Sequence, residues 1–338
     1  MGLPSTEAKT ALNLNEILSP IASDMLTLNE VIKARLSSQV ALIDQVSTYI
    51  IQAGGKRLRP ALLFLISQAL ADGKQIHHTH DLAAVIEFIH TATLLHDDVV
   101  DESDLRRGRK TANAVFGNAA SVLVGDFLYS RAFQMMIAPG ELRVMEILSN
   151  ATNTIAEGEV LQLLNMHDPD VDENRYLQVI LFKTAKLFEA STELGALISG
   201  ATEAQIHAAA NYGKHIGVAF QVMDDWLDYT SDAAQMGKNA GDDLREGKPT
   251  LPLIYLLNHG NPAERELAKH AIERQEELTE EFFQEVLQAV RSSGALDYTL
   301  EFAQKEAAKA RAYLSSFPDN VARQSLLDLC DYSLARKT

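Results

Sequence analysis

Two aspartate clusters with identical spacing stand far apart in the sequence, Asp97-Asp98-x-x-Asp101 and Asp224-Asp225-x-x-Asp228. Residues four apart share one face of a helix, so the first and last carboxylates of each cluster should point in the same direction. Chance would produce two copies with a probability well below about 0.01. Such carboxylates repel one another unless cations bind them. Mg²⁺ typically binds one or two carboxylates together with substrate phosphates. The pattern therefore favours Mg²⁺ ions around a diphosphate over two solvated helix ends.

Each cluster ends a helical stripe of small or polar residues. Ile86, His90 and Thr93 share the face of Asp97, and Gly217 and Gln221 share the face of Asp224. This is an unusual composition for a core face. We expect both stripes to line a site.

Basic residues accompany the acids. The segment GGKRLRP (54–60) places Lys56, Arg57 and Arg59 before a helix, where backbone amides and cations bind anions. Arg106 and Arg107 follow the first cluster, and Lys183-Thr184 interrupts an apolar helix. Further lysines, Lys238 and Lys248, lie in the glycine-broken segment 237–252. Taken singly, a surface turn or a lysine that reaches water would explain each of them. Together they predict a site for phosphate groups.

The elements that must position these residues are helices. Residues 21–53 and 74–107 lack proline and glycine, 295–317 is similarly free, and apolar residues within 82–95 recur mostly every three or four positions. No stretch alternates with period two for long. We predict an all-α fold of roughly a dozen helices, with residues 13–338 as a single domain and residues 1–12 as a loose tail. Breaks are expected near Gly54-Gly55, Asp72-Gly73, Pro139-Gly140, 165–174, 230–250 and 258–262.

Composition narrows the class of partner. The net charge of −16 argues against non-specific binding to nucleic acid or to an anionic membrane surface. The one cysteine, Cys330, allows no internal disulfide, which fits a reducing compartment. The N-terminal residues lack the pattern of a signal peptide, and the longest apolar stretch, PALLFLISQALA, is too short for a bilayer. We expect a cytoplasmic protein without a membrane anchor.

The motifs GGKRLRP, LLHDDVVDESDLRRG, VGDF, KTAKLF, GVAFQVMDDWLD and GKNAGDDLREGKPTLP, in this order, resemble the trans-polyprenyl diphosphate synthases. The resemblance covers about residues 25–335. Within the family, the stretch EFIHTATLLHDDVVDESD is similar to that of bacterial members that make an octaprenyl (C40) chain. One departure is Trp226, which is bulkier than the small apolar residue expected inside the second aspartate motif.

The resemblance implies an isoprenoid synthase-type helical bundle around a deep central cavity, usually a homodimer. It implies successive condensation of isopentenyl diphosphate onto an allylic diphosphate such as farnesyl diphosphate, with two to three Mg²⁺ ions. The product would be a long all-trans chain for a quinone, passed to a membrane prenyltransferase. The implied metal ligands are Asp97, Asp101 and Asp224, with Asp98, Asp225 and Asp228 as further ligands or as residues that support the ligands. The residues implied for the allylic diphosphate are Arg106, Lys183, Lys238 and Lys248, with Thr184 and Gln221 near the cation. Those for isopentenyl diphosphate are Lys56, Arg59, His90 and Arg107.

Product length should depend on small residues before the first aspartate. The resemblance implies that bulk at Ala92 or Thr93 closes the cavity, and here both side chains are small. A helical rise of 1.5 Å per residue gives a depth of roughly 22 Å from Asp97 back to Leu82. We place the floor further down, at Met135 or Met136.

Several alternatives remain open from the sequence. The product could be another length between C35 and C50. A terpene cyclase would share the first aspartate motif but needs no second diphosphate site. A non-catalytic subunit of a heteromeric synthase should have lost aspartates, whereas all six are present. An acidic scaffold protein would bind Ca²⁺ without any dependence on diphosphate.

Overall fold

The computed structural model describes residues 13–52, 54–71, 73–106, 108–230, 241–274 and 279–336. The first half contains helices and a two-stranded hairpin: α1 (Leu14–Ile17), a 3-10 turn η1 (Ser19–Ile21), α2 (Ala22–Leu36), α3 (Ala41–Gln52), α4 (Leu58–Leu70), α5 (Thr79–Val100), β1 (Leu105–Arg106), β2 (Arg109–Lys110), α6 (Ala112–Phe116), α7 (Asn118–Met136) and α8 (Leu142–Asn165). The second half contains α9 (Glu173–Val179), a π-helical turn η2 (Ile180–Ala185), α10 (Lys186–Ile198), α11 (Glu203–Thr230), α13 (Asp242–Arg245), α14 (Leu251–His259), α15 (Pro262–Glu273), α16 (Glu280–Ser292), α17 (Ala295–Tyr313), a 3-10 turn η4 (Leu314–Ser316) and α18 (Val321–Ala335).

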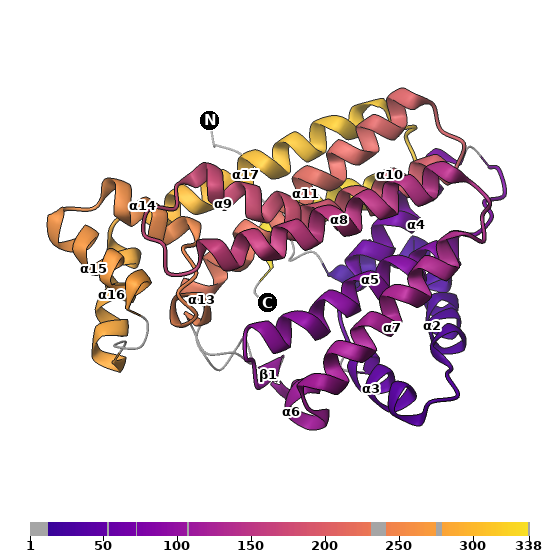
Figure 1. Ribbon diagram of the computed structural model, residues 1–338. Coiled ribbons are helices and arrows are strands. Elements are labelled where there is room, and N and C mark those ends of the chain that lie inside the picture. The colour runs from indigo at the N-terminus through magenta and orange to yellow at the C-terminus, as the bar shows by residue number, and fades with distance from the viewer. Residues whose placement is uncertain are drawn as a thin grey trace, which may run out of the picture.

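The helices form a bundle with a smaller group at one end. Helix α5 packs along α7, and α11 packs along both α10 and α17. Figure 1 shows α8, α10, α11 and α17 running alongside one another, with α14, α15 and α16 gathered at the left end. The main apolar core lies between α4, α5, α7, α10 and α11, and a second cluster holds α14–α16 together. The predicted all-α fold is confirmed.

The bundle differs from the sequence prediction in several places. The uninterrupted stretch 21–53 is broken between α2 and α3, because the backbone amide of Ser38 donates to Asp44 and that of Val40 donates to Ser38. Two short strands follow the first aspartate cluster, a π-helical turn lies at 180–185, and a short helix lies inside the predicted break at 230–250. The α2–α3 break and the π-helical turn contain neither proline nor glycine, whereas Gly108 lies at the turn of the hairpin and Gly241 directly precedes α13. The described part of the chain has no helix long and apolar enough to cross a membrane.

Helices α5 and α7 are antiparallel neighbours joined by the hairpin and α6 (Figure 1). The backbone reverses between α6 and α7 at Gly117, whose φ of 86° favours glycine. The hydroxyl of Ser121, near the start of α7, donates to the carbonyl of Leu95, near the end of α5. The far end of α7 therefore lies toward the start of α5.

Candidate active site

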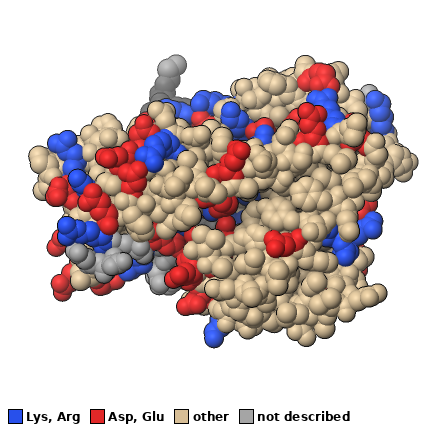
Figure 2. All heavy atoms as spheres, viewed as in Figure 1, with Lys and Arg blue, Asp and Glu red and all other residues tan. Residues whose placement is uncertain are grey.

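A cavity of about 670 Å³ opens between α3, α4, α5, α8, α10 and α11. Part of its wall is apolar and is formed by Leu94, Ile155, Leu187, Phe188 and Phe220. The rest of the described wall includes the polar and charged residues Lys56, Arg57, Arg59, His90, Thr93, Asp97, Asp98, Arg106, Glu159, Lys183, Thr184, Gln221, Asp224 and Arg336. Figure 2 shows acidic side chains gathered between α13 and the end of α5, beside a largely uncharged surface over α7 and α8.

The last turns of α5 deliver the first aspartate cluster to this cavity. Of the predicted stripe, His90, Thr93 and Asp97 line the cavity, whereas Ile86 is buried and Asp101 is absent from its described lining. The backbone amide of Asp101 still donates to the carbonyl of Asp97 at 2.8 Å, and the chain then leaves the helix at Glu102, whose φ of 50° is left-handed. Asp98 lies on the flank of the stripe and its side chain is fully buried.

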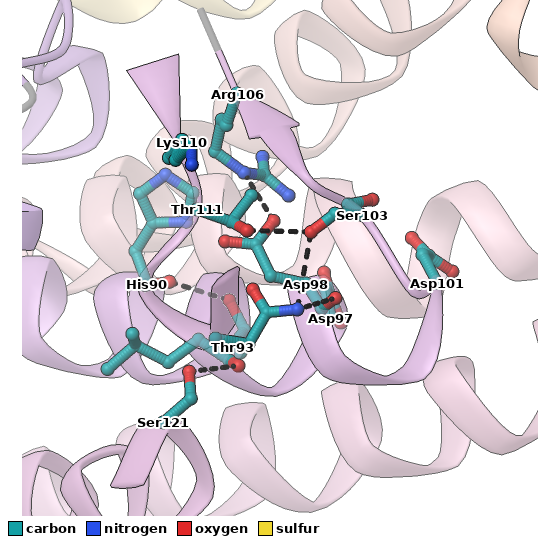
Figure 3. A network of polar contacts seen from close by, with 12 residues as sticks. His90, Thr93, Asp97, Asp98, Asp101, Ser103, Arg106, Lys110, Thr111 and Ser121 are labelled. Carbon is teal, nitrogen blue, oxygen red and sulfur yellow. Dashed lines mark hydrogen bonds and ion pairs between the residues drawn. The ribbon is translucent and has the colours of Figure 1, made fainter. Parts of the chain in front are cut away.

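The β1–β2 hairpin folds back over the end of α5 and brings Arg106 to Asp98. The Nε atom of Arg106 donates to Oδ1 of Asp98 at 2.8 Å (Figure 3). The amide of Asn113 donates to the carbonyls of Asp98 and Ser103, and the hydroxyl of Thr111 donates to Ser103, which anchors the hairpin. Burial raises the pKa of Asp98, and the Arg106 guanidinium opposes that rise. Arg106 thus compensates a buried carboxylate and also faces the cavity.

The π-helical turn carries Lys183 to the first aspartate motif and Thr184 to Gln221, just before the second. The Lys183 ammonium lies 3.4 Å from Oδ2 of Asp97 and 2.6 Å from Oε2 of Glu159. Burial lowers the pKa of Lys183, but these two carboxylates outweigh burial and raise it. Burial raises the pKa of Glu159 to about 7, even though the Lys183 ammonium opposes it. The Thr184 hydroxyl donates to the side-chain Oε1 of Gln221, on α11, at 3.1 Å.

The second aspartate cluster divides between the cavity and the interior. Asp224 lines the cavity and accepts from Arg336 at 2.7 Å. Asp225 is buried and accepts from Gln221 at 2.9 Å and from the Tyr176 hydroxyl at 2.5 Å. Burial, followed by the nearby Asp243 carboxylate, raises the pKa of Asp225 to about 8.

Asp228 and Trp226 complete this helix end. Asp228 is buried and accepts from the backbone amide of Asp243 at 3.3 Å, which orients the start of α13. Trp226, the residue that departs from the expected motif, packs against a separate apolar cluster with Val222 and Met223 and does not line the described cavity. The side chains of Asp225 and Asp228 therefore support the helix end that presents Asp224.

The segment GGKRLRP forms the opposite wall. Arg57 adopts a left-handed backbone, with φ of 46°, at the start of α4 and lies 3.7 Å from Glu87. The Arg59 guanidinium lies 4.5 Å above the Phe188 ring and 3.2 Å from Nε2 of His90. Burial lowers the pKa of Arg59 to about 10, which keeps it charged at neutral pH. Lys56 also lines the cavity.

Lys248 reaches the first cluster from the segment after α13. Its ammonium lies 3.1 Å from Asp101 and 2.5 Å from Glu246. Burial lowers the pKa of Lys248, but these carboxylates outweigh burial and raise it. Arg107 and Lys238 lie outside the described residues.

The residues predicted to set product length lie along α5 and α7. Thr93 lines the cavity, whereas Ala92, Met135 and Met136 are buried and are absent from its described lining. The two methionines end α7, on the side of the start of α5, and belong to the same apolar cluster as Leu82. Their predicted role stays a prediction.

Several charged residues of the cavity, Glu159 and Arg336 among them, were not singled out from the sequence. Glu159 lies beside Gly158 in the segment AEGEVLQLL. The only sequence signal that could have found it is an acidic residue on a half-apolar helix. Arg336 lies far from every motif, and its guanidinium reaches the Phe220 carbonyl, the Phe220 ring and Asp224. No spacing rule connects it with residue 224.

The carboxylates of the two aspartate clusters suit Mg²⁺. Asp97, Asp101 and Asp224 offer carboxylate oxygens, which suit Mg²⁺ bound jointly by one or two carboxylates and phosphate oxygens. In the ranges that the structure describes, no group of three or more His, Cys, Asp or Glu side chains could hold a metal ion by itself.

Comparisons with known proteins place the chain in a family. The polyprenyl synthetase family matches residues 40–290. The chain is 49% identical over 325 residues to the octaprenyl diphosphate synthase of Escherichia coli K12, covering 96% of this chain and 99% of that protein. It is 44% identical to an all-trans-nonaprenyl-diphosphate synthase (geranyl-diphosphate specific) of Rhodobacter capsulatus, covering 95% and 97%.

A solved structure is similarly close. The polyprenyl synthase of Caulobacter crescentus CB15, complexed with calcium and isoprenyl diphosphate, superposes with a TM-score of 0.92 at 44% identity, covering 98% of this chain and 100% of that chain. The predicted family and enzyme class are confirmed. The chain is a prenyltransferase and belongs to the polyprenyl synthetase family.

Proposed function

We propose that the protein condenses isopentenyl diphosphate repeatedly onto an allylic diphosphate, farnesyl diphosphate first, to give an all-trans octaprenyl (C40) diphosphate for a quinone side chain. One observation carries the proposal: a single cavity joins two cationic walls, one with Lys56 and Arg59 and the other with Lys183, to an apolar wall. Two diphosphates and a hydrocarbon chain need this combination. The 49% identity to an octaprenyl diphosphate synthase supports the C40 length.

The allylic diphosphate binds on the side of the aspartates. Asp97, Asp101 and Asp224 hold two to three Mg²⁺ ions, while Asp98, Asp225 and Asp228 support them through the contacts described above. Mg²⁺, when bound, supplies the charge that neutralises the leaving diphosphate. The cationic side chains that hold the same diphosphate are Arg106, Lys183, Lys238 and Lys248.

The allylic carbon–oxygen bond ionises in this environment. The electron pair leaves with the diphosphate, and the cationic side chains stabilise the charge that develops on it. Thr184 and Gln221, which are hydrogen-bonded to each other, present their oxygen dipoles near the allylic cation. The apolar wall formed by Leu187 and Phe188 excludes water, which would quench that cation.

Isopentenyl diphosphate binds on the opposite wall. Lys56, Arg59, His90 and Arg107 hold its diphosphate so that its double bond faces the cation. Arg59 is well suited to this role because Phe188 and His90 fix its guanidinium. The double bond attacks the allylic carbon, and the released diphosphate accepts the proton that restores a double bond. The product has one more isoprene unit and is again an allylic diphosphate.

The functional unit is a homodimer in this proposal. Large apolar side chains are exposed on α7 at Leu123 (66%) and Phe133, directly after it at Ile137, and on α8 at Leu163 and Leu164 (68%). The surface over these helices is largely uncharged in Figure 2, as an interface between subunits should be. Sedimentation should give twice the mass of the chain, and Leu123→Lys with Leu164→Lys should give the single-chain mass. The cytoplasmic location and delivery of the product to a membrane prenyltransferase stay predictions.

The test is incubation with Mg²⁺, farnesyl diphosphate and radiolabelled isopentenyl diphosphate, followed by chromatography of the dephosphorylated products. A dominant C40 alcohol is expected, absent in Asp97→Ala. Asp319→Ala, which removes a 99% exposed aspartate remote from the cavity, is the matched control and should leave the product unchanged. A single product of a different chain length would contradict only the C40 assignment and not the reaction. No incorporation by the folded protein would contradict the reaction and favour a cyclase or a non-catalytic subunit.

A further inference from the structure

A π-helical turn at Ile180–Ala185 interrupts the helical stretch from α9 to α10. Such turns widen a helix by one residue and frequently occur at functional sites. Here the turn presents two successive residues, Lys183 and Thr184, to the same cavity. Lys183 contacts Asp97 on α5, and Thr184 contacts Gln221 on α11. Because one turn carries both residues, its backbone position controls both contacts.

Gly158 on α8 lies directly against this turn. A Cβ atom at residue 158 would come within 2.6 Å of the backbone nitrogen of Lys183 and 2.9 Å of the carbonyl carbon of Phe182. These are backbone atoms, so the turn itself would have to shift. A glycine inside a helix costs about 1 kcal/mol relative to alanine, and this close approach provides a reason for it. Gly217 on α11 meets the other side, where a Cβ would lie 2.8 Å from the Cα of Ala185.

Glu159, the next residue on α8, holds the ammonium group that the turn presents. Its Oε2 lies 2.6 Å from Nζ of Lys183, whereas Asp97 lies 3.4 Å away. Glu159 also lines the cavity. In the proposed function the Asp97 carboxylate binds metal. It is then no longer available to pair with the Lys183 ammonium. Glu159 remains as the carboxylate that keeps the ammonium in place.

We propose that Gly158 and Glu159 form a positioning element for Lys183, in which Gly158 fixes the backbone of the turn and Glu159 fixes the direction of the ammonium. This rests on the proposed function, because it gives a supporting contact to a residue assigned to the allylic diphosphate. Neither residue is required to touch the substrate. Their removal should weaken binding on the allylic side and leave the isopentenyl diphosphate side unchanged.

Steady-state kinetics of Glu159→Ala and Glu159→Gln test the ammonium contact. Glu159→Ala should raise the KM for farnesyl diphosphate about tenfold, the range for losing one charge-assisted hydrogen bond, with the KM for isopentenyl diphosphate unchanged. Glu159→Gln keeps an acceptor for Lys183 and should recover most of the loss. Equal effects on both substrates, no effect on either, or a glutamine variant as weak as the alanine variant would overturn the proposal.

A pair of glycine variants tests the backbone contact. Gly158→Ala should shift the turn and raise the KM for farnesyl diphosphate. Gly195→Ala is the matched control, because its Cβ would lie 2.7 Å from the carbonyl oxygen of Leu63, away from the cavity. Both variants should melt at lower temperature than the wild type. Identical substrate constants for the two variants would overturn the role of Gly158, and if Gly158→Ala does not fold, the Glu159 pair decides.

Binding of inorganic diphosphate separates this inference from the proposed function. Calorimetry with Mg²⁺ should show binding to the wild type that weakens about tenfold in Glu159→Ala and recovers in Glu159→Gln. This pattern in a protein that does not consume isopentenyl diphosphate would support the positioning element and overturn the proposed reaction. Equal affinities for diphosphate in a protein that makes C40 product would overturn only the positioning element.

Discussion

Replacement of Arg106 by methionine tests how a buried carboxylate is tolerated beside the cavity. Asp98 is fully buried, its Oδ1 accepts from Arg106, and its Oδ2 has no hydrogen-bond partner among the described residues. Unit charges about 4 Å apart attract by about 4 kcal/mol at an effective dielectric constant of about 20. Solvent reaches the Arg106 side chain, which is 29% exposed, so we reduce this to about 3 kcal/mol. The free energy of unfolding of Arg106→Met should fall by that amount.

Urea denaturation without substrate or metal measures this change separately from catalysis. Adding Asp98→Asn removes the uncompensated charge, so the double variant should recover about 2 kcal/mol of the loss. Arg109→Met, on the neighbouring exposed strand, should change stability by less than about 0.5 kcal/mol. Because burial raises the folded-state pKa of Asp98, protonation favours the folded protein, and the deficit of Arg106→Met should shrink as the pH falls. A wild-type urea midpoint, or no recovery in the double variant, would refute the reasoning.

Three further outcomes are expected. Ala92→Phe should shorten the product, as chromatography of the alcohols would reveal, and an unchanged C40 chain would remove residue 92 from the cavity assignment. Burial raises the pKa of the Cys330 thiol to about 12, so a thiol reagent at pH 8 should label it only after unfolding; rapid labelling of the native protein would contradict its position in the core. Chelation with EDTA should stop turnover yet leave the melting temperature unchanged, because lysine and arginine side chains already pair with Asp97, Asp98, Asp101 and Asp224.

The sequence predicted an all-helical chain and several of the breaks between helices, because periodic apolar residues and the placement of proline and glycine report on local conformation. It missed the break between α2 and α3, where side chains of Ser38 and Asp44 replace the glycine or proline that usually marks an end. It also missed the π-helical turn, which depends on packing against Gly158 and Gly217 from distant helices. Packing contacts between distant helices leave no pattern in the local sequence.

The candidate site was predictable where residues repeat a motif and unpredictable where the fold joins distant segments. The stripe of His90, Thr93 and Asp97 followed from helical spacing and lines the cavity. The different environments of Asp224, at the cavity, and Asp225, beneath it, depend on Arg336 and Tyr176, which approach from other helices. Which acid each base contacts likewise required the folded chain.

The pairing of Asp97, Asp101 and Asp224 with Lys183, Lys248 and Arg336 has a thermodynamic consequence. A metal ion that binds these carboxylates must compete with cations the chain itself supplies, so its affinity for the protein alone is reduced. A diphosphate provides new acceptors for the displaced ammonium and guanidinium groups and thereby removes that competition. Metal and diphosphate must then strengthen each other's binding by the same factor, since such coupling is reciprocal. The enzyme would bind its metal most tightly when a substrate is present.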